Sequence, residues 1–235
     1  MRTLRGAERK TMPDYRKLRF NNLNSPEFRH IWLLLFWPVF GLLFTLLERG
    51  GISSGFHVMY CAMDDAIPFM EGFMIPYMFW HLYLFGMLAY TFFMDVPAFK
   101  RMMYFIIITY TVTVAVYFIY PTCQHLRPES FPRDNFLTRY IAHFYAFDTD
   151  TNVCPSIHVL GAVAVSFAAW NSRLFKKPIW RAAFSAMTAL ISLSTVFVKQ
   201  HSILDVLWAL PVCAGAWIAV SAAEKRKQKI KAPSL

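Results

Sequence analysis

Charged residues are scarce in this sequence. Only 16% of its 235 residues are Asp, Glu, Lys or Arg, whereas soluble proteins contain roughly 25%. Hydrophobic residues make up 57% and aromatic residues 17% of the chain. This composition predicts an integral membrane protein. In a membrane protein the placement of the net charge of +10 along the chain is more informative than its size. We therefore expect no nucleic-acid partner.

Several other features are missing. The four cysteines are too few and too scattered for a disulfide scaffold. The first 30 residues contain no apolar core of the signal-peptide type, so we expect no cleavage. No internal repeat or low-complexity linker is present. We therefore expect one membrane domain, residues 31–223, between a basic tail at 1–30 and a second basic tail at 224–235.

Six apolar stretches have roughly the length that a bilayer crossing requires. They predict an all-α, polytopic protein with six transmembrane helices. Asp95–Arg101 is expected to be a short turn, and Pro121–Cys154 is the longest loop. The six expected spans are Ile31–Leu47, Gly72–Met94, Met102–Tyr120, Pro155–Trp170, Ala182–Val198 and Ser202–Ala223.

The placement of positive charge predicts the topology. In a six-span arrangement, 19 of the 24 Lys and Arg residues fall in the two tails and in the turns that share their side. Loops rich in Lys and Arg stay in the cytoplasm, so both termini are expected to be cytoplasmic. The loop around Arg127 and the starts of the fourth and sixth spans would then meet at the extracytoplasmic surface.

Two polar clusters stand at the edges of apolar spans, where ionisable groups are costly unless they have partners or a function. The first is Cys154-Pro155-Ser156-Ile157-His158, and the second runs from Lys199 through His201 to Asp205. Ser156 and His158 would lie in the first turn of a helix, where free N–H groups attract anions. His201 and Asp205 are four residues apart, so on a helix the carboxylate can orient the imidazole. Such groups can bind a phosphate and attack it.

These motifs resemble the type 2 phosphatidic acid phosphatase superfamily, six-span enzymes that act on lipid phosphates without a metal. The family pattern is Lys-x6-Arg-Pro, then Pro-Ser-Gly-His, then Ser-Arg-x5-His-x3-Asp. The matching segments here are Arg127-Pro128, Pro155-Ser156-Ile157-His158 and Ser194-Thr195-x5-His201-x3-Asp205. The resemblance extends from about the second span to the sixth.

The resemblance implies a role for each matched residue. His201 would be the nucleophile that forms a phosphohistidine, and Asp205 would orient it. His158 would protonate the leaving oxygen and then activate the acceptor. Arg127, Lys199, Ser194 and the region of Ser156 would hold the phosphoryl oxygens. No cofactor and no metal are implied.

Two cations of the family pattern are missing from their usual places. Tyr120 stands where the family has lysine, and Thr195 stands where it has arginine. Lys199 and Arg139 are candidates to replace them. Similar departures occur in the branch that includes inositol-phosphorylceramide and sphingomyelin synthases and many bacterial phosphatases. Whether water or an alcohol accepts the phosphoryl group therefore stays open.

The expected function is a metal-independent phosphatase that acts on a membrane lipid phosphate at the outer leaflet. Phosphatidate, phosphatidylglycerophosphate and polyprenyl pyrophosphate are candidate substrates, and the expected location is a bacterial plasma membrane. One alternative is a lipid phosphotransferase that moves a phospho-headgroup to an alcohol. An alternative of another class is a transporter or lipid-binding module without chemistry.

Cysteine and histidine allow two further interpretations. Cys123-x-His125 with Cys154-x3-His158 has the residue types and spacing of a zinc site. Cys123 and Cys154 could instead form a disulfide on the outer face. The other histidines, His30, His57, His81 and His143, are interpreted as ordinary polar residues.

Overall fold

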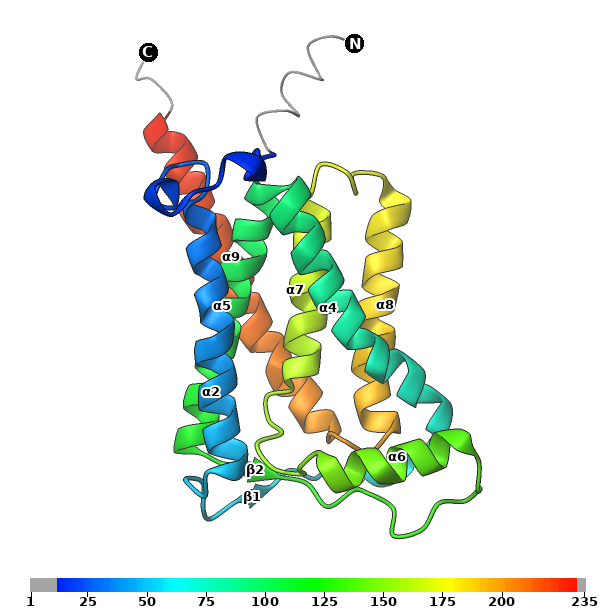
Figure 1. Ribbon diagram of the computed structural model, residues 1–235. Coiled ribbons are helices and arrows are strands. Elements are labelled where there is room, and N and C mark those ends of the chain that lie inside the picture. Colours follow the sequence, from blue (N-terminus) through cyan, green and yellow to red (C-terminus); the bar gives the residue numbers. More distant parts are fainter. Residues whose placement is uncertain (1–11, 232–235) are drawn as a thin grey trace.

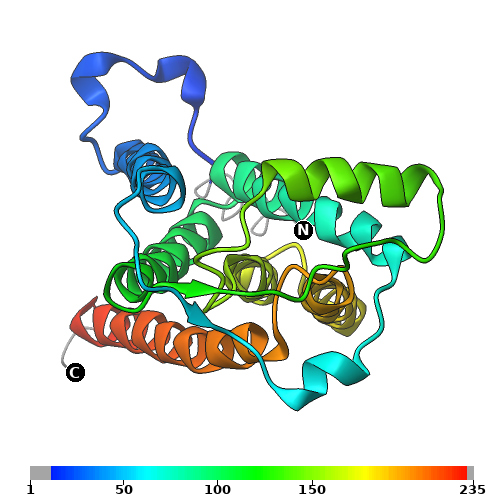
Figure 2. The same cartoon turned by 90° about the horizontal axis from the view of Figure 1, so that it is seen from below.

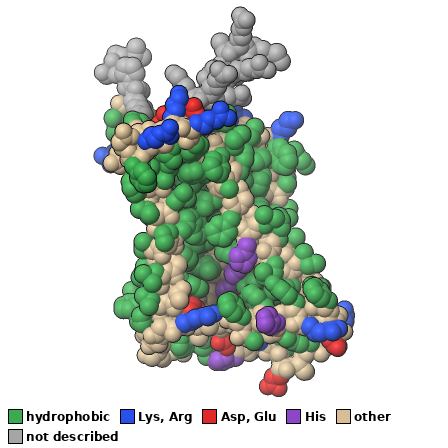
Figure 3. All heavy atoms as spheres, in the orientation of Figure 1, with side chains coloured by type: hydrophobic (Ala, Val, Ile, Leu, Met, Phe, Trp, Pro, Cys, Tyr) green, Lys and Arg blue, Asp and Glu red, His purple; other side chains and the backbone are tan. Residues whose placement is uncertain are grey.

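The computed structural model describes residues 12–231, and most of them are helical (Figure 1). Long apolar helices run side by side, and charged side chains gather at the two ends of the bundle (Figure 3). A broad band of hydrophobic side chains separates these ends. This arrangement is typical of a protein whose middle lies in the hydrocarbon region of a bilayer.

The elements follow one another as short 3-10 turns, long helices and a two-stranded parallel sheet. In chain order they are η1 Tyr15–Lys17, η2 Phe20–Asn22, η3 Arg29–Leu35, α2 Phe36–Arg49, β1 His57–Val58, α3 Ala62–Ala66, η4 Glu71–Phe73, α4 Met74–Met94, α5 Val96–Ile119, β2 Thr122–Cys123, α6 Phe136–Phe147, α7 Ile157–Asn171, α8 Pro178–Phe197 and α9 Ile203–Lys231. In the sheet, His57 pairs with Thr122 and Val58 pairs with Cys123.

Helix α7 is the centre of the bundle. It packs against α4, α5, α8 and α9, which surround it when the molecule is seen along the helix axes (Figure 2). Its buried face carries small residues, among them Gly161, Ala162, Ala164 and Ala168, and these allow neighbouring helices to approach closely. At Gly161 an added Cβ would lie 2.8 Å from the Tyr110 hydroxyl and 2.9 Å from the Trp80 ring.

Within residues 12–231, five helical segments are long and apolar enough to cross a membrane. They are Arg29–Arg49, Glu71–Met94, Val96–Ile119, Pro178–Phe197 and Ile203–Ile230. The expected fourth span is α7, which is apolar but has only 15 residues. At about 1.5 Å per residue it is shorter than the hydrocarbon core of a typical bilayer. The membrane character is thus supported, and a count of six crossings stays a prediction.

The start of the third span was predicted wrongly. Helix α5 begins at Val96, so the segment expected to be a short turn, Asp95–Arg101, is mostly the first turns of a helix. The Asp95 side chain caps it by accepting a hydrogen bond from the Ala98 N–H at 3.2 Å. Pro97 stands in its first turn, a position that tolerates proline. The charges of Lys100 and Arg101 concealed this continuation in the sequence.

The longest loop contains a helix that the sequence analysis did not anticipate. Helix α6, Phe136–Phe147, begins with a capping box in which Asn135 and Thr138 exchange hydrogen bonds. It lies across the lower end of the bundle in Figure 1, the same end that holds β1 and β2. Only part of its apolar surface is buried, against Met74, Tyr77 and Val198.

The turns between α4 and α5 and between α7 and α8 share one end of the bundle with the start of α2 and the end of α9 (Figure 1). These are the segments in which positive charge concentrates. Helix α9 also continues to Lys231, so the expected basic tail from residue 224 is helical as far as it is described. The assignment of this end to the cytoplasm rests on the charge rule.

Candidate functional site

His158 and His201 lie together at the opposite end of the bundle. Their ring centroids are 5.7 Å apart, and the rings meet edge to face. His158 is in the first turn of α7, and His201 lies just before α9. Two polar clusters that are separated by more than 40 positions in the sequence therefore lie side by side.

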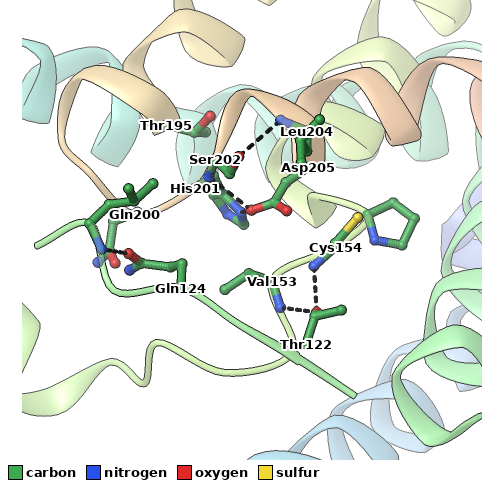
Figure 4. Close-up of polar contacts among 12 residues, drawn as sticks. Thr122, Gln124, Val153, Cys154, Thr195, Gln200, His201, Ser202, Leu204 and Asp205 are labelled. Atoms are coloured by element: carbon green, nitrogen blue, oxygen red, sulfur yellow. Dashed lines mark hydrogen bonds and ion pairs between the residues drawn. The ribbon is translucent and has the colours of Figure 1, made fainter. Parts of the chain in front are cut away.

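Asp205 fixes the orientation of His201. Its Oδ2 lies 3.0 Å from His201 Nδ1 and also accepts a hydrogen bond from the Ser202 N–H at 3.0 Å (Figure 4). Asp205 is completely buried, and His201 is 6% exposed. A carboxylate at Nδ1 favours the tautomer that carries its proton there. The Nε2 atom of His201 then holds the lone pair.

The backbone conformation at the end of α8 determines where His201 lies. Lys199 adopts a left-handed backbone conformation with φ of 52° directly after the helix, which is a common way for a helix to end. The N–H groups of Gln200 and His201 both donate to the carbonyl of Thr195, at 3.0 and 3.1 Å. The chain thus reverses within a few residues, and the backbone of His201 is held by the last turn of α8.

The start of α7 is tied directly to the start of α9. The Ser156 N–H donates to the Asp205 carbonyl at 3.2 Å. The Tyr117 hydroxyl of α5 donates to the Pro155 carbonyl at 2.8 Å. Thr122 Oγ1 accepts hydrogen bonds from the N–H groups of Val153 and Cys154 (Figure 4). These backbone contacts fix the distance between the two helix starts that carry the histidines.

Aromatic rings hold His158 in place. Its ring centroid is 4.4 Å from that of Tyr77 and 4.4 Å from that of Trp80, both on α4. The Nδ1 atom of His158 is buried and has no hydrogen-bond partner within the described part of the chain. A buried imidazole nitrogen without a partner is costly, which is expected where a ligand supplies the missing contact.

Both histidines line a cavity of about 250 Å³ between α2, α4, α6 and the start of α7. The apolar part of its wall includes the rings of Phe44, Trp80, Phe144 and Phe147. Figure 3 shows histidine side chains within a recess in the lower half of the face turned to the viewer. The polar and ionisable lining residues are Glu48, Tyr77, His81, Tyr117, Asp148, Thr149, Thr151, Asn152, His158, Gln200 and His201. Among the lining residues that the structure describes, none is Lys or Arg.

Arg127 lies beside this cavity, and its guanidinium is hydrogen-bonded to other residues of the protein. Its guanidinium donates to the side-chain oxygen of Gln200 from Nε and Nη2. It also donates to the carbonyls of Tyr145, Asp148 and Thr149 at 2.7–3.1 Å. These contacts use all five of its N–H groups. In this structure Arg127 therefore binds the end of α6 and the loop after it.

The other expected phosphate-binding residues lie outside the cavity lining. Lys199 Nζ donates to the Asp64 carbonyl at 2.7 Å, and burial lowers its pKa. The Ser194 hydroxyl donates to the Ile191 carbonyl inside α8. Arg139 is paired with Asp134 at 3.0 Å on the exposed side of α6. Ser156 is fully buried next to His158, and its Oγ has no partner among the described residues.

Tyr120, at the position of the family lysine, stacks on His57 with ring centroids 3.8 Å apart. Its contact joins the end of α5 to β1 and supplies no charge to the site. The structure thus brings together His158, His201 and Asp205, the residues expected to be catalytic, whereas the expected phosphate-binding cations do not join them.

Three residues that the sequence analysis passed over line the cavity. His81 was interpreted as an ordinary polar residue, and it stands on α4 facing this space. Glu48 and Asp148 place two carboxyl groups there. Burial raises the pKa of Asp148 above its ordinary value, and the nearby Arg127 and His201 oppose that rise. The signal for His81 was its position inside an apolar span.

The zinc and disulfide interpretations find no support in the geometry. Among the described residues, no group of three or more His, Cys, Asp and Glu side chains is placed to hold a metal ion. Cys123 and Cys154 are both free and buried. Burial raises the pKa of each thiol, which disfavours the thiolate that binds zinc.

Comparisons of the chain with protein-family models, curated proteins and solved structures found no match. The likeness to the type 2 phosphatidic acid phosphatases rests on the motifs.

Proposed function

We propose that this protein is a membrane enzyme that transfers the phosphoryl group of a lipid phosphate through a phosphohistidine. The observation that carries the proposal is the pairing of His201 with the buried Asp205, directly facing His158 at the wall of one cavity. Two imidazoles, one oriented by a carboxylate, are the groups that such a transfer needs for its nucleophile and its acid and base.

In the first step, His201 Nε2 attacks the phosphorus atom. A nitrogen–phosphorus bond forms, and the bond from phosphorus to the lipid oxygen breaks. His158 gives its proton to the departing oxygen, so that a neutral lipid alcohol leaves. The bond between His201 and Asp205 stabilises the charge that develops on the ring.

In the second step, His158 takes a proton from the acceptor as the acceptor oxygen attacks phosphorus. The nitrogen–phosphorus bond breaks and His201 is restored. With water as acceptor the product is inorganic phosphate, which defines a lipid phosphatase. In this scheme the N–H groups of the first turn of α7 bind the phosphoryl oxygens, because the start of a helix favours anions.

A second candidate is the transfer of a phospho-headgroup to an alcohol, and the charges of the cavity favour it. The described lining contains the carboxyl groups of Glu48 and Asp148 but no Lys or Arg. A phosphate monoester carries up to two negative charges, whereas a phosphodiester carries one. A diester with a cationic headgroup fits such a lining at lower electrostatic cost.

The test uses the purified full-length chain in detergent with excess chelator. Phosphatidate, phosphatidylglycerophosphate and a polyprenyl pyrophosphate are supplied in turn, and released phosphate is measured. Parallel reactions supply a phosphodiester lipid with an alcohol acceptor such as inositol, and the headgroup-transfer product is measured. His201→Ala is the control in every reaction.

Release of phosphate supports the phosphatase, and formation of the transfer product supports the second candidate. Absence of both, with wild-type and His201→Ala alike, would overturn the proposal and favour a lipid-binding module or transporter. Activity that is lost in chelator and restored by zinc would contradict the role of His201 as nucleophile.

A further inference from the structure

A second cavity lies at the other end of the bundle, far from the histidine pair. It has a volume of about 910 Å³ and is formed by η3, the start of α5 and the end of α9. In Figure 1 these segments are at the upper end, whereas α6 and the β-strands are at the lower end. The volume falls in the range of about 300–1,000 Å³ that is typical of ligand sites.

Three cations from distant parts of the chain line this cavity: Arg29, Lys100 and Lys227. Lys100 is half-buried and lies within electrostatic range of the other two. Lys227 Nζ stands over the Tyr104 ring at 5.6 Å. Among residues 12–231, no carboxylate forms an ion pair with any of the three.

Among the described residues that line the cavity, the one acidic side chain, Glu224, is already paired with an arginine. Glu224 is bound by Arg101 Nε at 2.5 Å, and Arg101 also donates to the Asn171 carbonyl at 3.1 Å. Glu224 is therefore not available as the counter-ion of Lys100. The cavity keeps a positive potential at its mouth, which a bound anion would offset.

Deeper in the cavity the lining becomes apolar. Leu33, Ile107, Ile108 and Val220 form this part, and they come from helices that are long enough to cross a membrane. A small inorganic anion would leave this apolar surface unfilled. An occupant with a phosphate group at one end and a hydrocarbon chain at the other would satisfy both parts.

We propose that the cavity between η3, α5 and α9 is a binding site for an anionic phospholipid. Its phosphate lies among Arg29, Lys100 and Lys227, and an acyl chain follows the apolar groove along α5 and α9. The three cations stand at the ends of membrane-spanning segments, the depth at which lipid headgroups are found. The site does not depend on the activity of the histidine pair.

The experiment is native mass spectrometry of the full-length protein released from detergent, with dioleoylphosphatidylglycerol titrated against dioleoylphosphatidylcholine. The wild type should retain the anionic lipid preferentially. The triple variant Arg29→Gln, Lys100→Gln, Lys227→Gln should bind phosphatidylglycerol roughly 100-fold more weakly, at about fivefold for each charge. Its binding of phosphatidylcholine should not change.

Lys225→Gln with Arg226→Gln is the matched control, because both residues are exposed on the same part of α9 and do not line the cavity. This control should keep wild-type binding. Ile108→Trp provides a second test that leaves the charge unchanged. Its bulky ring in the apolar part of the cavity should exclude the acyl chain and so weaken lipid binding.

Two outcomes with the wild-type protein would overturn the proposal. One is equal retention of the two lipids by the wild type. The other is competition by inorganic phosphate at the concentration of the lipid, which would show that the site recognises an anion without its chain. If the triple variant fails to fold, wild-type lipid retention by Ile108→Trp would overturn it as well.

Discussion

The carboxylate of Asp64 accepts a hydrogen bond from the Ser202 hydroxyl at 2.6 Å across 138 positions of the chain. Its other oxygen accepts from the Ile203 N–H at 2.8 Å, and Oδ2 also accepts from the Cys61 N–H at 2.9 Å. Asp64 is 2% exposed. The short helix α3 thereby caps the start of α9, two residues beyond His201.

Asp64→Ala should destabilise the protein by about 3 kcal/mol, because it leaves three donors without their acceptor: the Ser202 hydroxyl and the Ile203 N–H at the start of α9, and the Cys61 N–H at the start of α3. Thermal unfolding in detergent measures the loss. Asp65→Ala is the control, since the Asp65 side chain is exposed and should change stability by less than about 0.5 kcal/mol. Equal effects of the two substitutions would contradict the capping role.

The close approach of helices at Gly161 gives a second prediction. An alanine Cβ there would meet the Trp80 ring at 2.9 Å, and Trp80 supports His158. Gly161→Ala should therefore cost about 1–3 kcal/mol of stability and also reduce activity by moving the ring of His158. Unfolding midpoints and turnover are measured together.

Gly86→Ala is the matched substitution on α4, where an added Cβ meets nothing within 4 Å. It should cause no loss of stability, since alanine is the better helix former. If Gly161→Ala behaved in the same way as Gly86→Ala, the bundle would not be closely packed around α7.

The close placement of His158, His201 and Asp205 could be predicted from the sequence because much of its geometry is local. Helix α7 begins at Ile157, two residues later than expected, so that Pro155 lies before the helix and Ser156 is its N-cap. His158 is nevertheless in the first turn, and the spacing of four residues between His201 and Asp205 allows their side chains to meet. The apolar runs predicted most of the helix positions for the same reason.

The positions of the residues around this cluster could not be predicted from the sequence pattern. Asp64, Glu48 and Asp148 come from loops or helix ends, and no periodicity reveals which way such side chains face. The direction of Lys199 depends on the left-handed turn at its own backbone, so its contact with the Asp64 carbonyl was not predictable from its distance to His201 in the sequence. Helix α6 was missed because its polar residues interrupt the apolar pattern.

Asp148 gives a prediction about pH. Its pKa in the folded protein is raised, mainly by burial, so the folded state holds this proton more tightly than the unfolded state. The free energy of unfolding therefore falls as pH rises through the interval between the two pKa values. Asp148→Asn removes the titrating carboxyl group and with it this pH-dependent loss of stability. The amide oxygen of asparagine can still accept the hydrogen bond that Gln200 donates to Asp148.

The Asp148→Asn variant should be more stable than the wild type at about pH 7, and its advantage should shrink toward about pH 4, where the unfolded carboxyl becomes protonated. Unfolding midpoints across this range provide the measurement. An advantage that is independent of pH would show that Asp148 acts through packing and not through its charge.

The last prediction separates the roles of the two histidines. If His201 attacks phosphorus, His201→Ala can form no phosphoenzyme with any substrate. His158→Ala keeps the nucleophile and the contact between His201 and Asp205. A substrate with a good leaving group, such as an aryl phosphate, needs little protonation and should still phosphorylate His201. The phosphoenzyme should then accumulate, because activation of the incoming water also depends on His158.

Labelled phosphate should therefore be trapped on His158→Ala, in a linkage that is labile in acid and stable in base, and should be absent from His201→Ala. Label on both variants, or a linkage to serine, would refute the assignment of His201 as the nucleophile.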